Sequence, residues 1–256
     1  MSPSNLEILA YEPSPLGMIC LRQRELLSEP GTMVTEITLD HQFLMSSHNT
    51  ASERALARHA LEMHQGRDLE VLVGGLGLGY TAREVLTSDR VAQTEVVELL
   101  PPLIDWFREG LVPLAHELRA DSRFAVVAGD VFVRLSEPAQ RKYDLILVDV
   151  DHSPDEHLGD GNASFYTEEG LELAKRHLAP EGVLGVWSYA ESSHFADALR
   201  TVFSEVRIES VTFENRVVGE EETNWLFFAR GSSRTLPPAG SRMPRESGSR
   251  GTRPER

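Results

Sequence analysis

Apolar residues in the middle of the chain come in short unbroken runs, and the segments between these runs have apolar residues at helical spacing. The runs predict strands at 69–74, 94–98, 124–128, 143–149 and 182–188. Helical spacing predicts helices at 81–88, 101–110, 112–119, 131–138, 167–177 and 193–203. Strands that are apolar throughout are covered on both faces, so this alternation predicts an α/β protein with a mainly parallel sheet and helices on both sides.

The beginning and end of this region follow other patterns. Short runs with turn residues between them predict antiparallel strands at 6–11, 17–22, 32–39 and 42–45. We therefore expect a small antiparallel β domain over residues 1–50, followed by a helix that Ser52 caps. Strands at 206–212 and 223–229 have no helix between them, which predicts an antiparallel pair at the edge of the sheet. A seven-stranded nucleoside-binding domain is expected over residues 51–230.

The last 26 residues differ from the rest in composition and charge. Residues 231–256 hold glycine, serine, proline and arginine with almost no apolar side chains, so we expect a disordered basic tail. The formal net charge is −15, and six arginines against two glutamates give the tail +4, which leaves −19 for the remainder. Such an acidic body disfavours binding to nucleic acid, because phosphates require a basic surface.

Several classes of protein are excluded by what the chain lacks. No apolar run reaches the ~20 residues of a membrane span, and no signal-peptide pattern is present, so we expect a cytoplasmic protein without a membrane partner. The single cysteine, Cys20, excludes an intrachain disulfide and a cysteine-rich zinc site. Acids at 149–160 have a superficial calcium-loop spacing, but Pro154 stands where such a loop needs glycine. We expect no metal.

A glycine-rich segment follows the first strand of the predicted parallel sheet. Gly75, Gly77 and Gly79 would allow a sharp turn and let a ligand lie against bare backbone, just before a helix begins. Glu98 ends the next strand 19 positions after Gly79 (98 − 79), near the ~20-residue offset at which a carboxylate holds ribose hydroxyls. The pattern predicts a nucleotide-binding βαβ unit, and the alternative is a tight turn without a ligand.

Acids also follow the third and fourth strands of the sheet. Asp130 comes after the third strand, and Asp149 comes after the fourth. Because ligands of open α/β sheets lie outside the carboxyl ends of the strands, we expect these side chains to converge with Glu98 on one crevice. Asp130 could accept a hydrogen bond from an adenine amino group or cap the following helix, and Asp149 could hold an ammonium group.

As a set, these motifs resemble the spermidine synthase family, the polyamine aminopropyltransferases. The matching segments are 39–44, 75–79, 83–86, 97–98, 129–130, 143–149 and 165–166, with Glu53 as the acid after the N-terminal domain. The resemblance implies a Rossmann-like class I methyltransferase fold with an N-terminal β domain and a homodimer. It also implies a transferase that uses a sulfonium nucleoside, either S-adenosylmethionine or its decarboxylated form.

Two departures from the family pattern bear on the reaction. Leu78 stands where the family carries an aspartate, and the position of the family's amine base holds His152, with Asp151 one residue earlier. An aspartate at position 78 would repel the carboxylate of S-adenosylmethionine, and a leucine does not. We therefore predict S-adenosylmethionine-dependent methyl transfer to a small amine-type acceptor, with Asp151 or His152 as the base.

The candidate residues fall into three groups. Nucleoside binding is expected at Gly75, Gly77, Leu78, Gly79, Glu98, Leu99, Asp130, Val131 and Asp149. Catalysis is expected at Asp149, Asp151 and His152, and acceptor binding at Gln42 and Tyr189. Two alternatives remain open, namely aminopropyl transfer to a polyamine and a non-catalytic protein that binds a nucleoside or polyamine. The terminal antiparallel pair of strands argues against an NAD-dependent oxidoreductase.

Overall fold

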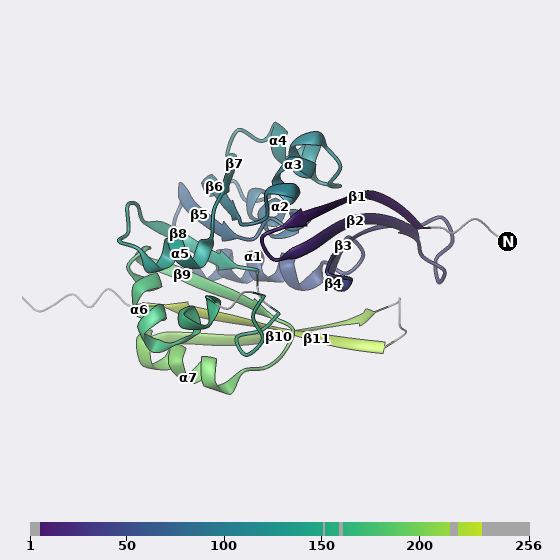
Figure 1. Cartoon of the computed structure of the whole chain (residues 1–256). Coiled ribbons are helices and arrows are strands. Elements are labelled where there is room, and N and C mark those ends of the chain that lie inside the picture. The colour runs from purple at the N-terminus through teal and green to yellow at the C-terminus, as the bar shows by residue number, and fades with distance from the viewer. Residues whose placement is uncertain (1–5, 151, 159–160, 216–219, 232–256) are drawn as a thin grey trace, which may run out of the picture.

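The computed structural model describes residues 6–150, 152–158, 161–215 and 220–231. These residues form two β-sheets and the helices that cover the larger one (Figure 1). The predicted tail at 231–256 lies outside the described residues except for Gly231. No helix in the described ranges is long and apolar enough to cross a membrane.

The smaller sheet is formed by the N-terminal part of the chain. Its strands, in spatial order, are β1 (Leu6–Ser14), β2 (Gly17–Glu25), β3 (Met33–Leu39) and β4 (Gln42–Ser46). Every neighbouring pair is antiparallel, which confirms the predicted N-terminal β structure. Asp40 and His41 have φ of 45° and 69° in the turn between β3 and β4, as a two-residue hairpin turn of the primed type requires. This short turn places β4 beside β3.

The larger sheet has seven strands in the order β10-β11-β9-β8-β5-β6-β7. Their bounds are β5 (Leu69–Gly74), β6 (Val91–Glu98), β7 (Phe124–Ala128), β8 (Tyr143–Val148), β9 (Leu178–Ser188), β10 (Glu205–Asn215) and β11 (Glu220–Arg230). Strands β5 to β9 pair in parallel, whereas β10 and β11 are antiparallel to their neighbours, as predicted. The order reverses at β5, between β8 and β6, and a crevice for a ligand is expected at such a reversal.

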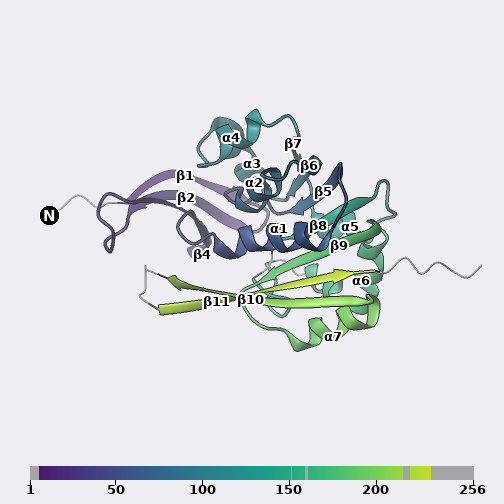
Figure 2. The ribbon, with the colours of Figure 1, turned by 180° about the vertical axis from the view of Figure 1, so that it is seen from behind.

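Helices cover both faces of this sheet (Figures 1 and 2). One face is packed against α1 (Ala51–Met63), α2 (Tyr80–Leu86), α3 (Pro101–Glu109) and α4 (Ala115–Ala120). The other face is packed against α5 (Val131–Ser136), α6 (Glu168–Lys175), α7 (Ser193–Val202) and the short 3₁₀ helix η1 (Asn162–Tyr166). The α-helices lie close to their predicted ranges, because each carries an apolar stripe that faces the sheet, whereas η1 has no counterpart in the prediction.

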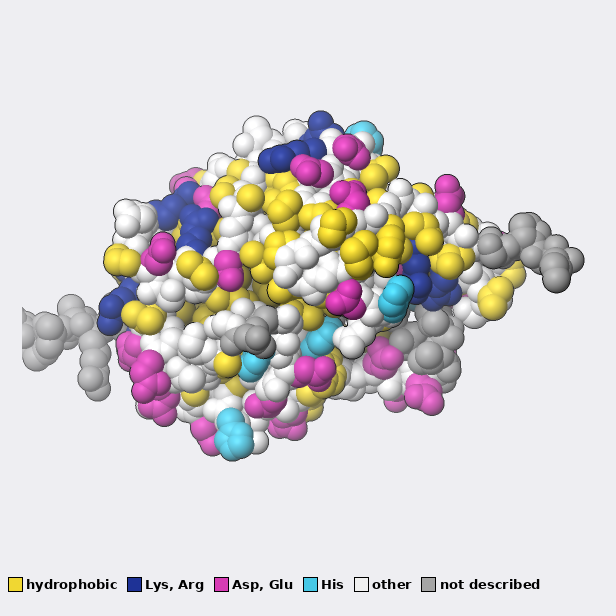
Figure 3. All heavy atoms as spheres, in the orientation of Figure 1, with side chains coloured by type: hydrophobic (Ala, Val, Ile, Leu, Met, Phe, Trp, Pro, Cys, Tyr) yellow, Lys and Arg dark blue, Asp and Glu magenta, His cyan; other side chains and the backbone are white. Residues whose placement is uncertain are grey.

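The N-terminal sheet shares a hydrophobic core with the larger sheet. Ile19, Leu21 and Ile37 belong to the same buried cluster as Leu56 of α1 and Val73 of β5. This joint core holds the inner face of the N-terminal sheet against the α/β domain, next to the carboxyl end of β5. On the outside, hydrophobic side chains gather over β1 and β2, and acidic side chains gather over α6 (Figure 3).

The predicted cap of α1 is wrong. The N-cap position is Thr50, which makes no side-chain capping bond, and Ser52 is buried inside the first turn. The Ser52 hydroxyl donates instead to Oε2 of Glu53 at 2.9 Å. Two strands also begin earlier than predicted, β6 at Val91 and β9 at Leu178, since their first residues extend beyond the continuous apolar runs.

Candidate active site

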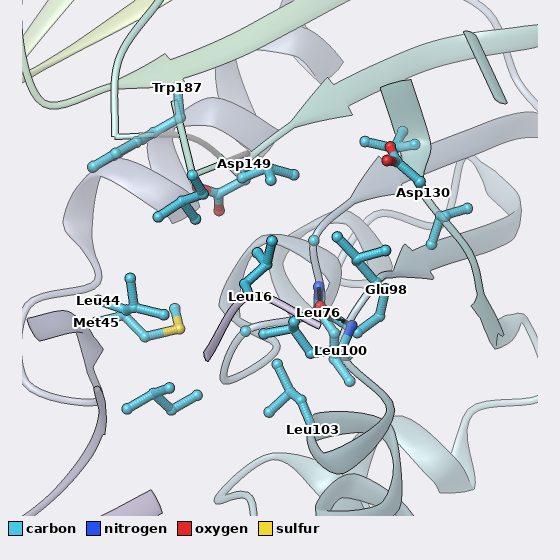
Figure 4. A pocket seen from close by; sticks show the side chains of 18 of the residues that line it. Leu16, Leu44, Met45, Leu76, Glu98, Leu100, Leu103, Asp130, Asp149 and Trp187 are labelled. Atoms are coloured by element: carbon cyan, nitrogen blue, oxygen red, sulfur yellow. Dashed lines mark hydrogen bonds between the residues drawn. The ribbon is translucent and has the colours of Figure 1, made fainter. Parts of the chain in front are cut away.

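A cavity of about 370 Å³ lies at the carboxyl ends of the central strands and extends beneath the N-terminal sheet (Figure 4). The strand ends and the segments after them contribute Gly75, Leu76, Gly77, Glu98, Leu99, Leu100, Asp130, Val131, Asp149 and His152. The N-terminal sheet and the turn between β1 and β2 contribute Leu16, Ile19, Ile37, Leu44 and Met45. The cavity therefore has one wall from each of the two sheets.

The glycine segment lines the cavity at two positions with left-handed backbone, Gly75 and Gly77. Gly75 has φ of +92°, and a Cβ atom there would lie 2.3 Å from the carbonyl oxygen of Asp149. Gly77 has φ of +49°, and its Cβ atom would lie 2.6 Å from the sulfur of Met45. The left-handed backbone favours glycine at both positions, and at Gly75 the backbone oxygen of Asp149 leaves no room for a side chain. These contacts bring β4 and the end of β8 onto the glycine segment.

Two other candidates from the glycine segment do not line the cavity. Leu78 is 0% exposed and packs in the hydrophobic core between the sheet and its helices. Gly79 occupies the N-cap position of α2 with φ of +92°. A Cβ atom on Gly79 would meet the side chain of Leu118 in α4 at 2.6 Å. The nucleoside-binding roles of Leu78 and Gly79 therefore stay predictions, without support from the cavity wall.

Glu98 lines the cavity from the end of β6. Its carboxylate is 5% exposed and accepts hydrogen bonds from the backbone N–H groups of Leu76 and Leu100, both at 2.8 Å. Burial raises the pKa of Glu98, and these backbone donors oppose that rise. Glu98 thus ties the glycine segment to the end of β6. Its predicted contact with ribose hydroxyls stays a prediction.

Asp130 both caps a helix and lines the cavity. Its Oδ1 atom accepts hydrogen bonds from the N–H groups of Phe132 at 2.8 Å and Val133 at 3.2 Å, so it is the N-cap of α5. The helix-capping alternative is therefore realised. The carboxylate still faces the cavity next to Val131, which keeps the adenine-binding role open as a prediction. Figure 4 shows Glu98 and Asp130 towards one end of the cavity and Leu44, Met45 and Trp187 towards the other.

Two buried carboxylates of the cavity wall are close enough for their charges to interact. Asp149, at the end of β8, accepts a hydrogen bond from the Thr81 hydroxyl at 2.7 Å, and burial raises its pKa to about 6. Glu53, in the first turn of α1, is 7% exposed. Burial, and then the negative charge of Asp149, raise the pKa of Glu53 to about 7. Neither carboxylate makes an ion pair within the part of the chain that the structure describes, so the pair presents negative charge to the cavity.

The sequence motifs singled out Glu53 only as an acid after the N-terminal domain, without a role. A signal was present, because Glu53 stands three, four and seven positions before Leu56, Ala57 and Ala60, which are all 0% exposed. An acid on the buried stripe of a helix is unusual and indicates a function or a partner.

The remaining candidates are divided between the cavity and the surface. His152 lines the cavity, and its ring lies edge-on to the ring of Tyr189 with centroids 6.4 Å apart. Tyr189 is 47% exposed, donates its hydroxyl to Glu156 at 2.6 Å and is not part of the cavity wall. Gln42 is exposed at the start of β4 and is also outside the wall. Asp151 lies outside the described residues.

The cavity wall contains several acidic side chains. Among the described residues, the acids Glu53, Glu98, Asp130 and Asp149 line it, and no lysine or arginine does. The described ranges contain no group of three or more histidine, cysteine or acidic side chains placed to hold a metal ion. The cavity is therefore suited to a ligand that carries positive charge.

The sheet order, the glycine segment and the crevice at the reversal point define a Rossmann-like α/β protein with an accessory N-terminal β-sheet. The family model for the spermine/spermidine synthase domain matches residues 50–215. The chain belongs to this family, and the predicted resemblance is confirmed.

Curated relatives share part of their length with this chain. Polyamine aminopropyltransferase 2 of Streptomyces coelicolor is 35% identical over 123 residues, which cover 47% of this chain and 22% of the relative. Polyamine aminopropyltransferase of Oceanobacillus iheyensis is 34% identical over 137 residues, which cover 53% of this chain and 25% of the relative. The chain thus spans about a quarter of the length of these relatives.

The fold is also found in solved structures. A spermidine synthase in complex with the transition-state analogue AdoDATO matches with a TM-score of 0.69 at 20% identity, covering 87% of this chain and 73% of that chain. This similarity confirms the predicted Rossmann-like fold with its small N-terminal antiparallel sheet.

Proposed function

We propose that this protein is an aminopropyltransferase, which moves an aminopropyl group from decarboxylated S-adenosylmethionine to an amine. The observation that carries the proposal is the buried pair Glu53 and Asp149 in a cavity whose described wall has no lysine or arginine. Two adjacent buried carboxylates are costly without a cation, and the ammonium group of the decarboxylated nucleoside supplies one. The curated relatives, named polyamine aminopropyltransferases, support the same reaction.

Methyl transfer from S-adenosylmethionine has less support. That prediction rested on Leu78, which was expected to face the charged end of the nucleoside. Leu78 is buried in the core, so its replacement of an aspartate says little about the charge of the ligand. The carboxylate of S-adenosylmethionine would also enter a cavity whose described wall holds four acids and no lysine or arginine. The alternative that the sequence left open, aminopropyl transfer, is therefore the better interpretation.

In the proposed arrangement the nucleoside lies along Gly75 and Gly77, with its ribose at Glu98 and its adenine at Asp130. The amine nitrogen attacks the carbon bonded to sulfur, a C–N bond forms, the C–S bond breaks, and the nucleoside leaves as a neutral thioether. Positive charge moves from sulfur to nitrogen in this step. The contribution of the protein is mainly to align the reactants and exclude water, and Asp149 holds the cationic end of the donor.

Product analysis tests the proposal. The protein is incubated with either donor and a panel that includes putrescine, cadaverine, spermidine and a simple monoamine, and products are identified by mass spectrometry. We expect an aminopropylated amine with the decarboxylated donor and no methylated amine with S-adenosylmethionine. A methylated product would contradict the proposal. Calorimetric binding of the decarboxylated donor without turnover would favour the non-catalytic alternative.

Three finer properties are proposed on the resemblance and the sequence alone. We infer a homodimer, a cytoplasmic location and an N-terminal domain that ends at residue 50. Light scattering coupled to size-exclusion chromatography tests the first of these, and a monomer at micromolar concentration would contradict it.

A further inference from the structure

We propose that the acceptor is a monoamine with an apolar body, and that Leu44 helps to select it against diamines. The inference rests on the proposed aminopropyl transfer and names the class of acceptor for the same cavity. It differs from transfer to putrescine, whose far end carries a second ammonium group.

The side of the cavity beneath the N-terminal sheet is apolar. Figure 4 shows Leu44, Met45 and Trp187 at one end of the cavity, away from Glu98 and Asp130. Among the described wall residues, those that come from the N-terminal sheet and its first turn are all apolar. Together with Trp187 of β9 they form what is here called the apolar chamber: Leu16, Ile19, Ile37, Leu44, Met45 and Trp187. This chamber is suited to an apolar part of a ligand.

Acids of the N-terminal sheet have partners elsewhere. Glu36 of β3 forms ion pairs with Arg22 at 2.8 Å and with Arg24 at 2.7 Å. Glu12 of β1 accepts a hydrogen bond from the ring N–H of Trp106 at 2.7 Å. Neither carboxylate lines the cavity. Within the described ranges, the N-terminal sheet therefore supplies no negative charge to the apolar chamber.

The described part of the loop after β8 adds no carboxylate to the chamber either. Glu156 accepts a hydrogen bond from the Tyr189 hydroxyl at 2.6 Å, and both residues lie outside the cavity wall. His152 does line the cavity, but an imidazole has no negative charge that could offset the charge of an ammonium group. A second ammonium group in the chamber would thus have no oppositely charged partner among the described residues.

Carboxylates for the reacting amine line the same cavity. Figure 4 shows Asp149 between Trp187 and Asp130, and Glu53 is close enough to Asp149 for their charges to interact. An ammonium group at these two carboxylates, beside the proposed nucleoside, leaves the rest of the acceptor in the apolar chamber. There the ammonium gives a proton to one of the two carboxylates, and its nitrogen attacks the donor carbon. The C–N bond forms as the C–S bond breaks, which gives an N-alkylated diaminopropane and a neutral thioether.

The balance of charge and apolar contact favours a monoamine. Burial of an ammonium group without a paired carboxylate is costly, and a diamine would bear this cost at its far end. An alkyl or aryl group at the same place gains free energy from leaving water, by a factor of about three to four in affinity for each buried methylene. The chamber therefore discriminates by the charge of the acceptor's far end.

The test compares matched amines with the decarboxylated donor and the wild-type protein. Hexylamine and cadaverine have the same number of heavy atoms and differ by a methyl group in place of the far ammonium group, and pentylamine and putrescine form a second such pair. We expect kcat/KM for hexylamine to exceed that for cadaverine by ~10²-fold. We also expect hexylamine to exceed butylamine by about tenfold, because it buries two more methylenes.

Variants of β4 test the role of Leu44. Leu44→Glu places a carboxylate on the chamber wall, and we expect it to raise kcat/KM for cadaverine and to lower the ratio of hexylamine to cadaverine at least about tenfold. Leu44→Gln has the same shape without the charge, and it should weaken hexylamine without a gain for cadaverine. Phe43→Glu adds the same charge at the neighbouring position, which is 55% exposed and outside the wall, so its ratio should match the wild type.

The outcomes separate this inference from the proposed function. Equal or better transfer to cadaverine and putrescine than to the matched monoamines would overturn the monoamine class and would still support aminopropyl transfer. The same shift in Phe43→Glu as in Leu44→Glu would overturn the role of Leu44. If Leu44→Glu does not fold, the wild-type pairs alone decide the class of acceptor. Absence of transfer to every amine would overturn the proposed function, and this inference with it.

Discussion

Substitution of Glu53 by glutamine should make the protein more stable at high pH. The folded state raises the pKa of Glu53 from 4.5 to about 7, so folding favours the protonated form. The stability that comes with this proton is complete below pH 4.5 and is lost as the pH rises through 7. The difference between the two pKa values, at about 1.4 kcal/mol per pH unit, corresponds to about 3 kcal/mol at pH 8. Part of the raised pKa of Glu53 comes from the negative charge of Asp149, which can itself take up a proton, so the figure is an upper bound.

Urea denaturation at pH 4.5 and pH 8 measures this effect. We expect Glu53→Gln to unfold with a free energy up to about 3 kcal/mol higher than the wild type at pH 8, and with no such gain at pH 4.5. Glu62→Gln, which changes an exposed acid of the same helix, should follow the wild type at both pH values. If the difference between wild type and Glu53→Gln were the same at both pH values, the carboxylate would not be desolvated, and the reasoning from burial would be refuted.

Three further predictions concern the glycine segment, the cap of α5 and the end of α1. Gly75→Ala should lower the free energy of unfolding in urea by about 2–4 kcal/mol, through backbone strain and the clash with Asp149, and should weaken donor binding more than tenfold in calorimetry. Gly31 has a similar φ of +91° but open space around it, so Gly31→Ala should lower the free energy of unfolding by only about 1–2 kcal/mol in the same urea assay. Asp130→Ala should cost about 1 kcal/mol in thermal denaturation by loss of the cap, and unchanged donor affinity would contradict its predicted contact with adenine. Arg90→Ala should cost about 2 kcal/mol in urea denaturation, because its guanidinium donates to carbonyl groups at the end of α1, and an unchanged midpoint would show that water replaces these bonds.

The parts of the fold that depend on local patterns could be predicted from the sequence. The strand, glycine segment, helix and acid from Leu69 to Glu98 are contiguous in the chain, and their order alone specifies a parallel βαβ unit. The convergence of Glu98, Asp130 and Asp149 on the cavity wall followed from the rule that parallel strands end at one edge. The antiparallel pair β10 and β11 followed from the absence of a helix between two apolar runs.

The parts that depend on packing between distant segments could not be predicted. Gln42, the predicted acceptor-binding residue of β4, lies outside the cavity wall. Strand β4 shifts register against β3 between Ile37 and Thr38, and Leu44 and Met45 line the cavity instead. The motif position of Leu78 gave no information on which way its side chain points. Glu53 lies near Asp149 because α1 packs against β8, and these two residues are 96 positions apart in the chain (149 − 53).

The joint core of the two sheets has a consequence for how this protein can diversify. Ile19 and Ile37 are part of the buried hydrophobic core and also line the cavity. A substitution that reshapes the cavity from this side therefore alters the free energy of folding at the same time. Changes of substrate preference should accumulate more readily at Leu44 and Met45, which face the cavity but are only partly buried.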